Sequence, residues 1–274
     1  VGEKLLKKIG VKNIIIINQD VDGNFNHNPE PIDKNLQQLS LAVKKSGADI
    51  GLAVDPDVDR LAVVDERGAF WGEEYTLVAV ADYIFKNYKT FQSKFKKNTV
   101  SNLSSSLALK DLAEKYQGGY FFSKVGEVNV IEKSKKVKAV ISGEGNGGII
   151  YPCFHYGRDA LVGIAFILSY LVAENKKASE IRKDLPNYYI VKEKIKLDSK
   201  IDIKKIFDKI EKKYHNLEII KIDGLKISFV PEKSWMHLRA SNTEPIIRIY
   251  CEAPTRKQAQ EKFKEISRLI NSIN

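Results

Sequence analysis

The stretch IGLAVDPDVDRLAVV, residues 50–64, decides the fold of the region around it. Two short apolar runs, Ile50 to Val54 and Leu61 to Val64, flank an acidic loop, and each has the length and the bounding turn signals of a buried strand. The β-branched run from Val11 to Asn18 predicts an earlier strand, and helical spacing ended by a glycine predicts a helix over residues 35–46. Strand, helix and strand at these lengths indicate a βαβ unit.

The alternation of helices and strands continues to about Pro186. Helices are expected at 72–88, 104–116 (capped by Ser104) and 159–175, with short strands at 99–103, 118–125 and 139–142. After Pro186 the pattern changes to one strand, one helix, several strands up to Cys251 and a last helix capped by Thr255. That order is typical of an α+β domain. The sequence therefore predicts α/β architecture followed by a smaller α+β domain.

Composition narrows the classes of function. The net charge of +10 comes from 37 Lys and 8 Arg spread along the chain, so solvated surfaces explain it better than a nucleic-acid interface. Such a surface would also attract anionic sugar phosphates. The longest apolar run, Leu161 to Ala173, is too short to cross a membrane and predicts a buried helix. Two distant cysteines, Cys153 and Cys251, and no leader segment favour a cytoplasmic chain without a disulfide or zinc site.

The loop DPDVDR, residues 55–60, carries chemistry. Asp55, Asp57 and Asp59 alternate, and in an extended segment that period places three carboxylates on one side. They would repel one another without a cation, and a few oxygen ligands with room for water and a phosphate oxygen suit Mg²⁺. Arg60 adds a planar fork suited to a phosphate. We therefore expect a magnesium site beside a phosphate site.

Two other interpretations of this loop stay open. An EF-hand would share the three aspartates and Glu66 at its twelfth position, but Arg60 stands where that loop needs glycine and the flanks are strand-like. The other alternative is an acidic surface turn, although a turn between two buried strands does not need three carboxylates.

A second loop, GEGNGG at residues 143–148, follows a predicted strand. Its glycines would let the backbone approach a ligand closely, and Glu144 and Asn146 could hydrogen-bond sugar hydroxyls. The signal is weak by itself, because a glycine-rich turn without a ligand is equally compatible with it. A nucleotide loop is disfavoured, since it needs a helix directly after it and Pro152 opposes one.

A third loop, RASNTEP at residues 239–245, follows an alternating strand. The loop amides and the side chains of Arg239, Ser241, Asn242 and Thr243 could cradle a phosphate. A turn satisfied by its own hydroxyl and amide side chains would have the same composition, so both interpretations stay open.

In this order, the three loops resemble those of the α-D-phosphohexomutase family, which includes phosphoglucomutase, phosphomannomutase and phosphoglucosamine mutase. The resemblance covers essentially the whole chain. It extends to four further segments: FNHNPEP at 25–31, GEEY at 72–75, KVG at 124–126 and YGRDAL at 156–161. The first and third loops are specific family marks, and GEGNGG is one variant of the family's sugar loop.

The resemblance implies the fold. The family has three related α/β domains and a smaller α+β domain around a central cleft. On that pattern, residues 1–69 are most of domain 2, residues 70–183 are domain 3 and residues 184–274 are domain 4. Domain 1, with its catalytic serine loop, would be missing, in line with a chain that opens on Val1. His-Asn-Pro at 27–29 imitates the serine loop, but Asn stands in the serine's place, so we assign it to domain 2.

The resemblance also implies phosphotransfer between the 1- and 6-positions of a hexose phosphate, through a bisphosphate that turns around in the cleft. Asp55, Asp57 and Asp59 would hold Mg²⁺, and Arg60 would steady the transferring phosphoryl group. Three positions would contact the sugar and its phosphate, and four would grip the non-reacting phosphate: Lys124, Glu144 and Asn146 for the first set, and Arg239, Ser241, Asn242 and Thr243 for the second.

Several functional alternatives stay open. The sugar-loop variant favours phosphoglucosamine mutase, with phosphomannomutase or phosphoglucomutase as the alternative. Standing alone without a phosphoserine, the chain would be an inactive module that binds magnesium and sugar phosphates. A magnesium-dependent phosphatase is a weaker alternative, because no aspartate lies in a loop that clearly offers a nucleophile. Gly148 stands where many relatives close the sugar loop with a histidine, so no histidine role is carried over.

Overall fold

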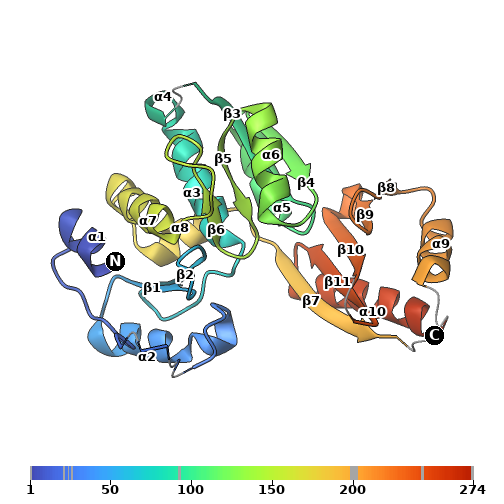
Figure 1. Cartoon of the computed structure of the whole chain (residues 1–274), viewed down its shortest axis with the longest axis horizontal. Coiled ribbons are helices and arrows are strands. Elements are labelled where there is room, and N and C mark those ends of the chain that lie inside the picture. The colour runs from blue at the N-terminus through green and yellow to red at the C-terminus, as the bar shows by residue number, and fades with distance from the viewer. Residues whose placement is uncertain are drawn as a thin grey trace. The chain divides into compact units, whose positions relative to one another are not determined.

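The chain folds into two compact units. The computed structural model describes residues 2–20, 22–23, 25, 27–91, 94–197, 203–241 and 244–272. One unit comprises residues 1–102 and 109–186, and the other comprises residues 103–108 and 187–274. The segment at 103–108 therefore packs with the C-terminal part of the chain, and each unit is described by itself below (Figure 1).

The first unit contains both helices and strands. Its elements are α1 (Gly2–Lys8), η1 (Asp33–Asn35), α2 (Gln37–Ser46), β1 (Ile50–Val54), β2 (Leu61–Asp65), α3 (Tyr75–Lys86), α4 (Tyr88–Phe91), β3 (Lys96–Asn102), α5 (Leu107–Lys115, whose first two residues belong to the other unit), β4 (Gly119–Ser123), α6 (Glu127–Val137), β5 (Ala139–Glu144), β6 (Gly148–Ile150), α7 (Ala160–Glu174) and α8 (Ala178–Asp184).

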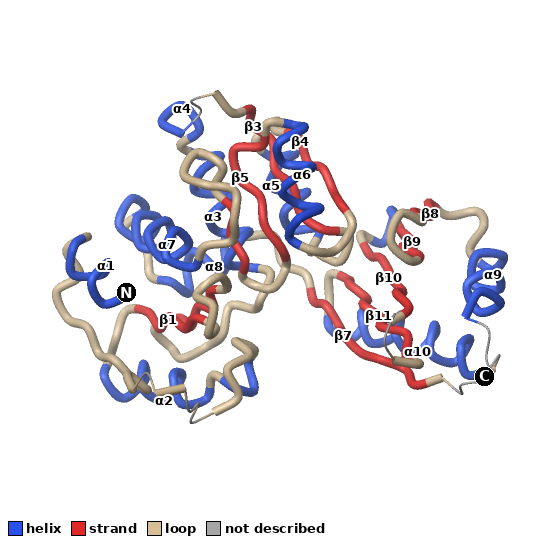
Figure 2. The backbone as a smooth tube through the Cα atoms, in the orientation of Figure 1, coloured by secondary structure: helices blue, strands red, loops and turns tan. Residues whose placement is uncertain are grey.

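A four-stranded sheet forms the centre of this unit, in the order β4-β3-β5-β6. β3 pairs in parallel with β4 and β5, whereas β6 runs antiparallel to β5 at the edge. Figure 2 shows β3, β4 and β5 as neighbouring strands. Every residue of β5 is buried, because α6 packs on β3, β4 and β5 while α3 packs on β5 and β6. Helices over a mostly parallel sheet confirm the expected α/β class.

The apolar helix α7 packs against α3. Only five of its fifteen residues are buried and Val172 is 81% exposed, so the prediction of a buried helix holds for one face of it. Asp159 caps its first turn by accepting hydrogen bonds from the backbone N–H groups of Leu161 and Val162, at 2.8 and 3.0 Å. Across the part of the chain that the structure describes, no helix combines the length and the apolar character needed to span a lipid bilayer.

β1 and β2 form a separate two-stranded antiparallel hairpin, joined by the 55–60 loop. Helix α2 packs on it, and the small core between them is made of Leu36, Val43, Ala62 and Val64. The two flanking strands were expected at these positions, and both are confirmed.

The predicted strand from Val11 to Asn18 is wrong. The structure places this run outside any helix or strand, and Ile15 and Ile16 are 65% and 43% exposed. A β-branched run becomes a strand only where a neighbouring strand offers hydrogen bonds and a second layer covers it. Among the described residues β1 pairs with β2 alone, so the expected βαβ unit is an antiparallel hairpin preceded by a helix.

The second unit is a sheet covered on one face by helices. Its elements, beside the start of α5, are β7 (Tyr189–Lys196), α9 (Ile203–Lys213), β8 (Glu218–Ile220), β9 (Leu225–Phe229), η2 (Val230–Glu232), β10 (Ser234–Ala240), β11 (Ile246–Ala253) and α10 (Arg256–Asn271). The strand order is β7-β11-β10-β9-β8 and all pairs are antiparallel. Thr255 caps α10 through the N–H of Gln258, as predicted.

Alternation along these strands separates an apolar face from a polar one. Met236 and Leu238 of β10 join the core beneath α9 and α10, together with Ile206 and Ile266 of those helices. His237 lies between them in sequence and belongs to the opposite face. This arrangement is the α+β domain expected after Pro186.

The polar face carries a buried cluster that includes the 103–108 segment. His237 Nε2 donates to the Asp223 carbonyl at 2.6 Å, and its Nδ1 lies 2.9 Å from Ser104 Oγ. Glu252 accepts from the Leu107 backbone N–H and from the Trp235 indole, each at 2.8 Å. Ser104 therefore bonds to the sheet, and α5 begins at Leu107, which corrects the predicted start of this helix at residue 104.

Candidate active site

The acidic loop is a tight and strained turn. Val58 N–H donates to the Asp55 carbonyl at 3.0 Å, and Asp55 N–H donates to the Arg60 carbonyl at 3.3 Å. Val58 has φ +58°, a left-handed conformation that costs a β-branched residue about 1–3 kcal/mol. The Val58 carbonyl accepts from the Ala160 N–H at 3.1 Å, which holds it in place. Strain of this kind clusters at ligand sites.

Asp55 organises this loop from within. One of its oxygens, Oδ1, accepts from the backbone N–H groups of Asp59 and Arg60, both at 3.0 Å, and Oδ2 accepts from Arg60 Nε at 2.6 Å. Burial by itself would raise the pKa of Asp55, but the hydrogen bonds from Arg60 and Asp59 lower it below its ordinary value. Asp55 is therefore an ionised carboxylate at neutral pH.

Arg60 lies between two carboxylates. Its Nη1 donates to Glu30 Oε1 at 2.6 Å while its Nε binds Asp55. Burial opposes the charge of this guanidinium, yet the hydrogen bonds that it donates to Asp55 and Glu30 raise its pKa. With 21% of the side chain exposed, Arg60 is a fixed cation that can still meet a ligand.

Asp59 offers an unsatisfied oxygen. Its Oδ1 is buried and has no hydrogen-bond donor among the described residues, and Arg60 Nε is 3.9 Å away. Burial and the neighbouring Asp55 carboxyl raise the pKa of Asp59. Two adjacent carboxyl groups disfavour each other's charge, and a divalent cation would relieve that repulsion. Asp55 and Asp59 thus fit a metal ion.

The third expected ligand stands apart. Asp57 is exposed, and within the described ranges no three His, Cys, Asp or Glu side chains are grouped so that they could hold a metal ion. The alternating spacing predicted convergence of three carboxylates. The left-handed residue at Val58 turns the segment away from the extended geometry on which that prediction depended.

The glycine-rich loop lies directly against the acidic one. Leu61 N–H donates to the Gly147 carbonyl at 3.0 Å, and Arg60 and Gly148 form an isolated antiparallel bridge. Gly147 has φ +89°, and a Cβ there would come within 2.5 Å of the Leu61 carbonyl oxygen. Only glycine permits this approach, so the glycines of this loop bring it to the acidic loop.

Glu144 is anchored before any ligand arrives. Its Oε1 accepts from Asn102 Nδ2 at 2.8 Å and from the Gly126 N–H at 3.1 Å. Asn146 Oδ1 accepts from the Gly148 N–H at 3.2 Å, so this side chain helps to close its own loop. Lys124 is exposed just after β4, two residues before the Gly126 amide that binds Glu144.

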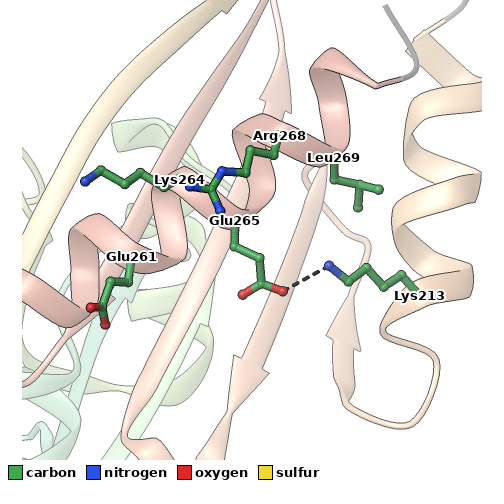
Figure 3. A pocket seen from close by; sticks show the side chains of 6 residues that line it. All are labelled: Lys213, Glu261, Lys264, Glu265, Arg268 and Leu269. Atoms are coloured by element: carbon green, nitrogen blue, oxygen red, sulfur yellow. Dashed lines mark hydrogen bonds and ion pairs between the residues drawn. The ribbon is translucent and has the colours of Figure 1, made fainter.

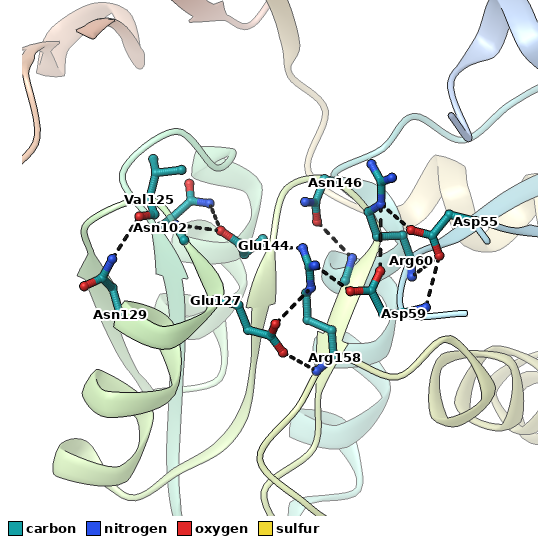
Figure 4. Close-up of polar contacts among 12 residues, drawn as sticks. Asp55, Asp59, Arg60, Asn102, Val125, Glu127, Asn129, Glu144, Asn146 and Arg158 are labelled. Carbon is teal, nitrogen blue, oxygen red and sulfur yellow. Dashed lines mark hydrogen bonds and ion pairs between the residues drawn. The ribbon is translucent and has the colours of Figure 1, made fainter. Parts of the chain in front are cut away.

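Arg158 joins the two loops, and although it lies in the YGRDAL segment at 156–161, no spacing in the sequence assigned it a role. Its Nη2 binds Asp59 Oδ2 at 2.5 Å and its Nη1 binds Glu144 Oε2 at 3.0 Å. Glu127 Oε1 accepts from the Arg158 backbone N–H at 2.7 Å, and Glu127 Oε2 lies 3.7 Å from its Nε. Figure 4 shows the guanidinium between these three carboxylates.

The third predicted loop belongs to the second unit. Arg239, at the end of β10, pairs with Asp223 at 3.2 Å (Nε to Oδ1), and its side chain is 27% exposed. Ser241 Oγ accepts from the Glu244 N–H at 3.3 Å, which matches the self-satisfied turn as well as a phosphate cradle. Asn242 and Thr243 lie outside the described residues.

A row of cations crosses the sheet beside this loop. Arg239 of β10 is directly opposite Arg248 of β11, which is directly opposite Lys194 of β7. Opposed residues of antiparallel strands share a face, and like charges in that arrangement repel each other. Arg248 and Lys194 are exposed, so this row has the charge and the access needed to bind an anion. Arg248 was not among the site residues predicted from the sequence.

A surface pocket in the same unit has no part in this chemistry. It lies between α9 and α10, has a volume of about 430 Å³, and is lined mainly by charged side chains, among them the Lys213–Glu265 ion pair (Figure 3). None of the predicted site residues lines it.

Comparison with known proteins identifies the family. Residues 1–68 match the model of phosphoglucomutase/phosphomannomutase, alpha/beta/alpha domain II. Residues 72–189 match the model of alpha/beta/alpha domain III, and residues 190–269 that of the C-terminal domain. The chain belongs to the phosphoglucomutase/phosphomannomutase family. In this phosphohexomutase chain, the acidic loop lies in domain II, the glycine-rich loop in domain III and the 239–245 loop in the C-terminal domain.

Relatives of this phosphohexomutase chain carry several names. It is 35% identical to a phosphoglucomutase/phosphomannomutase of Thermococcus kodakarensis, over 94% of this chain and 55% of that protein. It is 33% identical to a probable phosphoglucosamine mutase of Pyrococcus horikoshii, over 95% of this chain and 56% of that protein. It is 31% identical to a phosphomannomutase of Methanocaldococcus jannaschii, over 100% of this chain and 59% of that protein. The chain thus spans little more than half the length of these relatives.

A solved structure agrees with the family assignment. A phosphoglucomutase/phosphomannomutase family protein from Burkholderia thailandensis superimposes with a TM-score of 0.81 at 26% identity, over 98% of this chain and 57% of that one. The phosphohexomutase fold expected from the three loops is confirmed.

Proposed function

We propose that this chain is the metal-, sugar- and phosphate-binding part of a phosphohexose mutase, an isomerase that moves a phosphoryl group between the 1- and 6-positions of a hexose. The observation that carries the proposal is the direct apposition of the acidic and glycine-rich loops, with Leu61 and Gly147 hydrogen-bonded at 3.0 Å. That apposition brings metal-type carboxylates next to Glu144, a carboxylate suited to sugar hydroxyls.

Asp55 and Asp59 are the residues that would hold Mg²⁺, with Asp57 as the third ligand after a change in the exposed part of the loop. Bound there, the ion would neutralise charge on a transferring phosphoryl group. Arg60 supports the same role, because its guanidinium is held by Glu30 and Asp55 and would stay charged at every working pH.

Glu144 and Asn146 would accept or donate hydrogen bonds at sugar hydroxyls, and Lys124 would meet the sugar phosphate. Glu144 is ready for this task because Asn102, Gly126 and Arg158 fix its orientation in advance. A fixed acceptor loses less entropy when it binds a sugar than a mobile one does.

The second unit would hold the phosphate that does not react. Arg239 and Ser241 lie at the loop expected to bind it, with Asn242 and Thr243 completing the set. Arg248 strengthens this part of the proposal, because an anion between it and Arg239 would relieve the repulsion of two directly opposed guanidinium groups.

The nucleophile would come from outside these 274 residues. None of the three loops offers a serine placed as the family's phosphoserine is, and the chain covers 55–59% of the relatives named above. We propose that another domain of the same protein supplies it, and that the chain without it binds substrate and does not turn it over. A cytoplasmic location belongs to the same proposal, because a chain with only two cysteines, far apart in the sequence, suits a reducing compartment.

Phosphoglucosamine is the favoured substrate. Among the described residues of this region, five carboxylates (Glu30, Asp55, Asp59, Glu127 and Glu144) pair with two guanidinium groups. That excess of negative charge would favour a sugar with an ammonium group at its 2-position. A relative named as a probable phosphoglucosamine mutase supports the same choice.

The test is turnover by the full-length protein that contains this chain. Glucosamine 1-phosphate, mannose 1-phosphate and glucose 1-phosphate would be supplied separately with Mg²⁺, and the 6-phosphates followed by ³¹P NMR. The proposal expects conversion, with the highest kcat/KM for glucosamine 1-phosphate. A preference for mannose or glucose would overturn the choice of sugar, and no conversion of any of the three would overturn the proposed function.

A further inference from the structure

The backbone of Arg158 is fixed on both sides of the site. Arg158 forms a bridge with Ile150, and the next residue, Asp159, donates its N–H to the Ile149 carbonyl at 2.8 Å. One residue further, Ala160 N–H donates to the Val58 carbonyl of the acidic loop at 3.1 Å. The segment that carries Arg158 is therefore attached to the strand after the sugar loop and to the acidic loop itself.

The side chain of Arg158 runs across the glycine-rich loop. A Cβ placed on Gly148 would come within 2.4 Å of Arg158 Cδ, so the absence of a side chain at Gly148 leaves the path that the arginine follows. Its side chain is 19% exposed. The guanidinium is thus confined by its surroundings and not only by its ion pairs.

The Arg158 guanidinium contacts one carboxylate proposed to bind the metal and another proposed to bind the sugar. Nη2 binds Asp59, a proposed metal ligand, while Nη1 binds Glu144, a proposed sugar ligand. It uses Asp59 Oδ2 and leaves Oδ1 without a donor among the described residues. Glu144 is likewise fixed through both of its oxygens. A planar fork can hold two carboxylates in a set relation that a lysine cannot.

We propose that Arg158 is a positioning residue that couples the metal side of the site to the sugar side. It orients Asp59 so that Oδ1 faces an incoming cation, and through the same planar group it sets the position of Glu144. Outer hydrogen bonds to a metal-binding carboxylate commonly change metal affinity 10–100-fold. This inference rests on the proposed function, because it assigns Asp59 to the metal and Glu144 to the sugar.

The coupling has a measurable consequence. Because one planar group holds both Asp59 and Glu144, a cation that draws Asp59 toward it would also shift Arg158 and Glu144, and would thereby change the affinity for a hexose phosphate. By linkage, the hexose phosphate would tighten the binding of the metal by the same factor. Loss of Arg158 would break this link and loosen both loops, although the Leu61–Gly147 hydrogen bond would still hold them side by side.

The experiment titrates Mn²⁺ into the 274-residue chain, with and without glucosamine 6-phosphate, and follows free Mn²⁺ by electron paramagnetic resonance. We expect glucosamine 6-phosphate to tighten Mn²⁺ binding about fivefold or more in the unmutated chain. In Arg158→Met, Mn²⁺ should bind roughly tenfold more weakly or worse, and the effect of the sugar phosphate should disappear. Arg67→Met is the matched control, because Arg67 also binds a carboxylate, Asp65, outside the site.

Arg158→Lys separates position from charge. If Arg158 acts only as a positive charge that competes with the metal, Arg158→Met would bind Mn²⁺ more tightly and Arg158→Lys would behave as the unmutated chain. Either result would overturn the inference. If it acts by position, both variants weaken Mn²⁺ binding and both lose the coupling.

Amide hydrogen exchange without any ligand keeps the inference separate from the proposed function. We expect Arg158→Met to speed exchange in peptides covering residues 55–60 and 143–148, relative to Arg67→Met. Equal exchange in the two variants would contradict the coupling even if the chain binds metal. Faster exchange in a chain that binds no Mn²⁺ would support the link between the loops and refute the metal assignment.

Discussion

At the scale of single residues, the acidic loop is held in a conformation that its sequence does not favour. Val58 occupies the left-handed region although it is β-branched, and its carbonyl is fixed by Ala160. Hydrogen bonds from Ala160 to Val58 and from Asp59 and Arg60 to Asp55 stabilise this strained turn, in which Asp55 and Asp59 share one side. Removing the branched side chain should relieve the strain without removing that geometry.

Val58→Gly tests this strain. Glycine adopts positive φ freely, so we expect the free energy of unfolding to stay the same or rise by up to about 1 kcal/mol. Val54→Gly, in the neighbouring strand, should instead lose roughly 1 kcal/mol, because glycine weakens a strand. Urea unfolding of both variants measures the difference. An equal loss in the two variants would show that Val58 is not strained.

The residue types in the sequence identified the acidic and glycine-rich loops, but not the residues that contact them from elsewhere in the chain. The alternating aspartates and the clustered glycines can be seen in the sequence because their chemistry lies within six residues. Arg158, Glu30 and Arg248 could not be found in that way, since each acts on a partner that only folding brings near. The YGRDAL segment had been noted as a family resemblance, but nothing in its spacing pointed to Asp59.

At the scale of elements, apolar runs and capping residues predicted several helices and strands correctly, whereas other elements depend on tertiary contacts. The strands flanking the acidic loop, helix α7 and the Thr255 cap follow from apolar runs and capping chemistry. The run from Val11 to Asn18 has equal strand propensity and forms none, because pairing and burial are tertiary properties. Helices α6 and α8 were missed, since α6 is rich in charged and polar residues and α8 is a short helix, and such helices show only a weak apolar stripe.

The cationic row on the second sheet predicts a specific response to phosphate. At equal ionic strength, phosphate should raise the thermal unfolding midpoint of the chain more than chloride does, because it binds between opposed guanidinium groups. Arg248→Met should lose most of that increment. Arg256→Met, at the exposed start of α10, is the matched control and should keep it. An undiminished increment in Arg248→Met would exclude Arg248 from the phosphate site.

The buried Glu252 predicts a pH dependence of stability. Burial raises the pKa of Glu252 to about 7, against 4.5 when it is free, so the folded state holds this proton more tightly than the unfolded state. Its contribution to stability is complete below about pH 4.5 and is lost as the pH rises to about 7. Burial lowers the pKa of His237 to about 4, which has the opposite sign and raises stability between about pH 4 and 6.5. The two effects partly cancel in the unmutated chain.

Glu252→Gln separates them. Between pH 5 and 8, the unfolding free energy of the variant relative to the unmutated chain should rise by an amount on the order of 3 kcal/mol, because glutamine does not titrate. Glu261→Gln, on the exposed side of α10, is the control. A difference that does not change with pH would mean that Glu252 is ionised throughout this range.

At the scale of the whole molecule, three family domains carry three loops of different chemistry, and the two that lie in one compact unit are physically joined. The central claim is that the acidic loop is a divalent-metal site and not an acidic turn. The observation behind this claim is a buried oxygen of Asp59 that has no hydrogen-bond donor among the described residues.

The most direct measurement is Mn²⁺ binding by the 274-residue chain and by Asp59→Asn, followed by electron paramagnetic resonance. We expect one Mn²⁺ per chain, with binding at least about tenfold weaker in Asp59→Asn because a charged ligand is lost. Asp49→Asn, which removes an exposed carboxylate outside the loop, should bind as the unmutated chain does. If the unmutated chain binds no Mn²⁺, or if Asp59→Asn binds it equally well, the acidic loop is not a metal site.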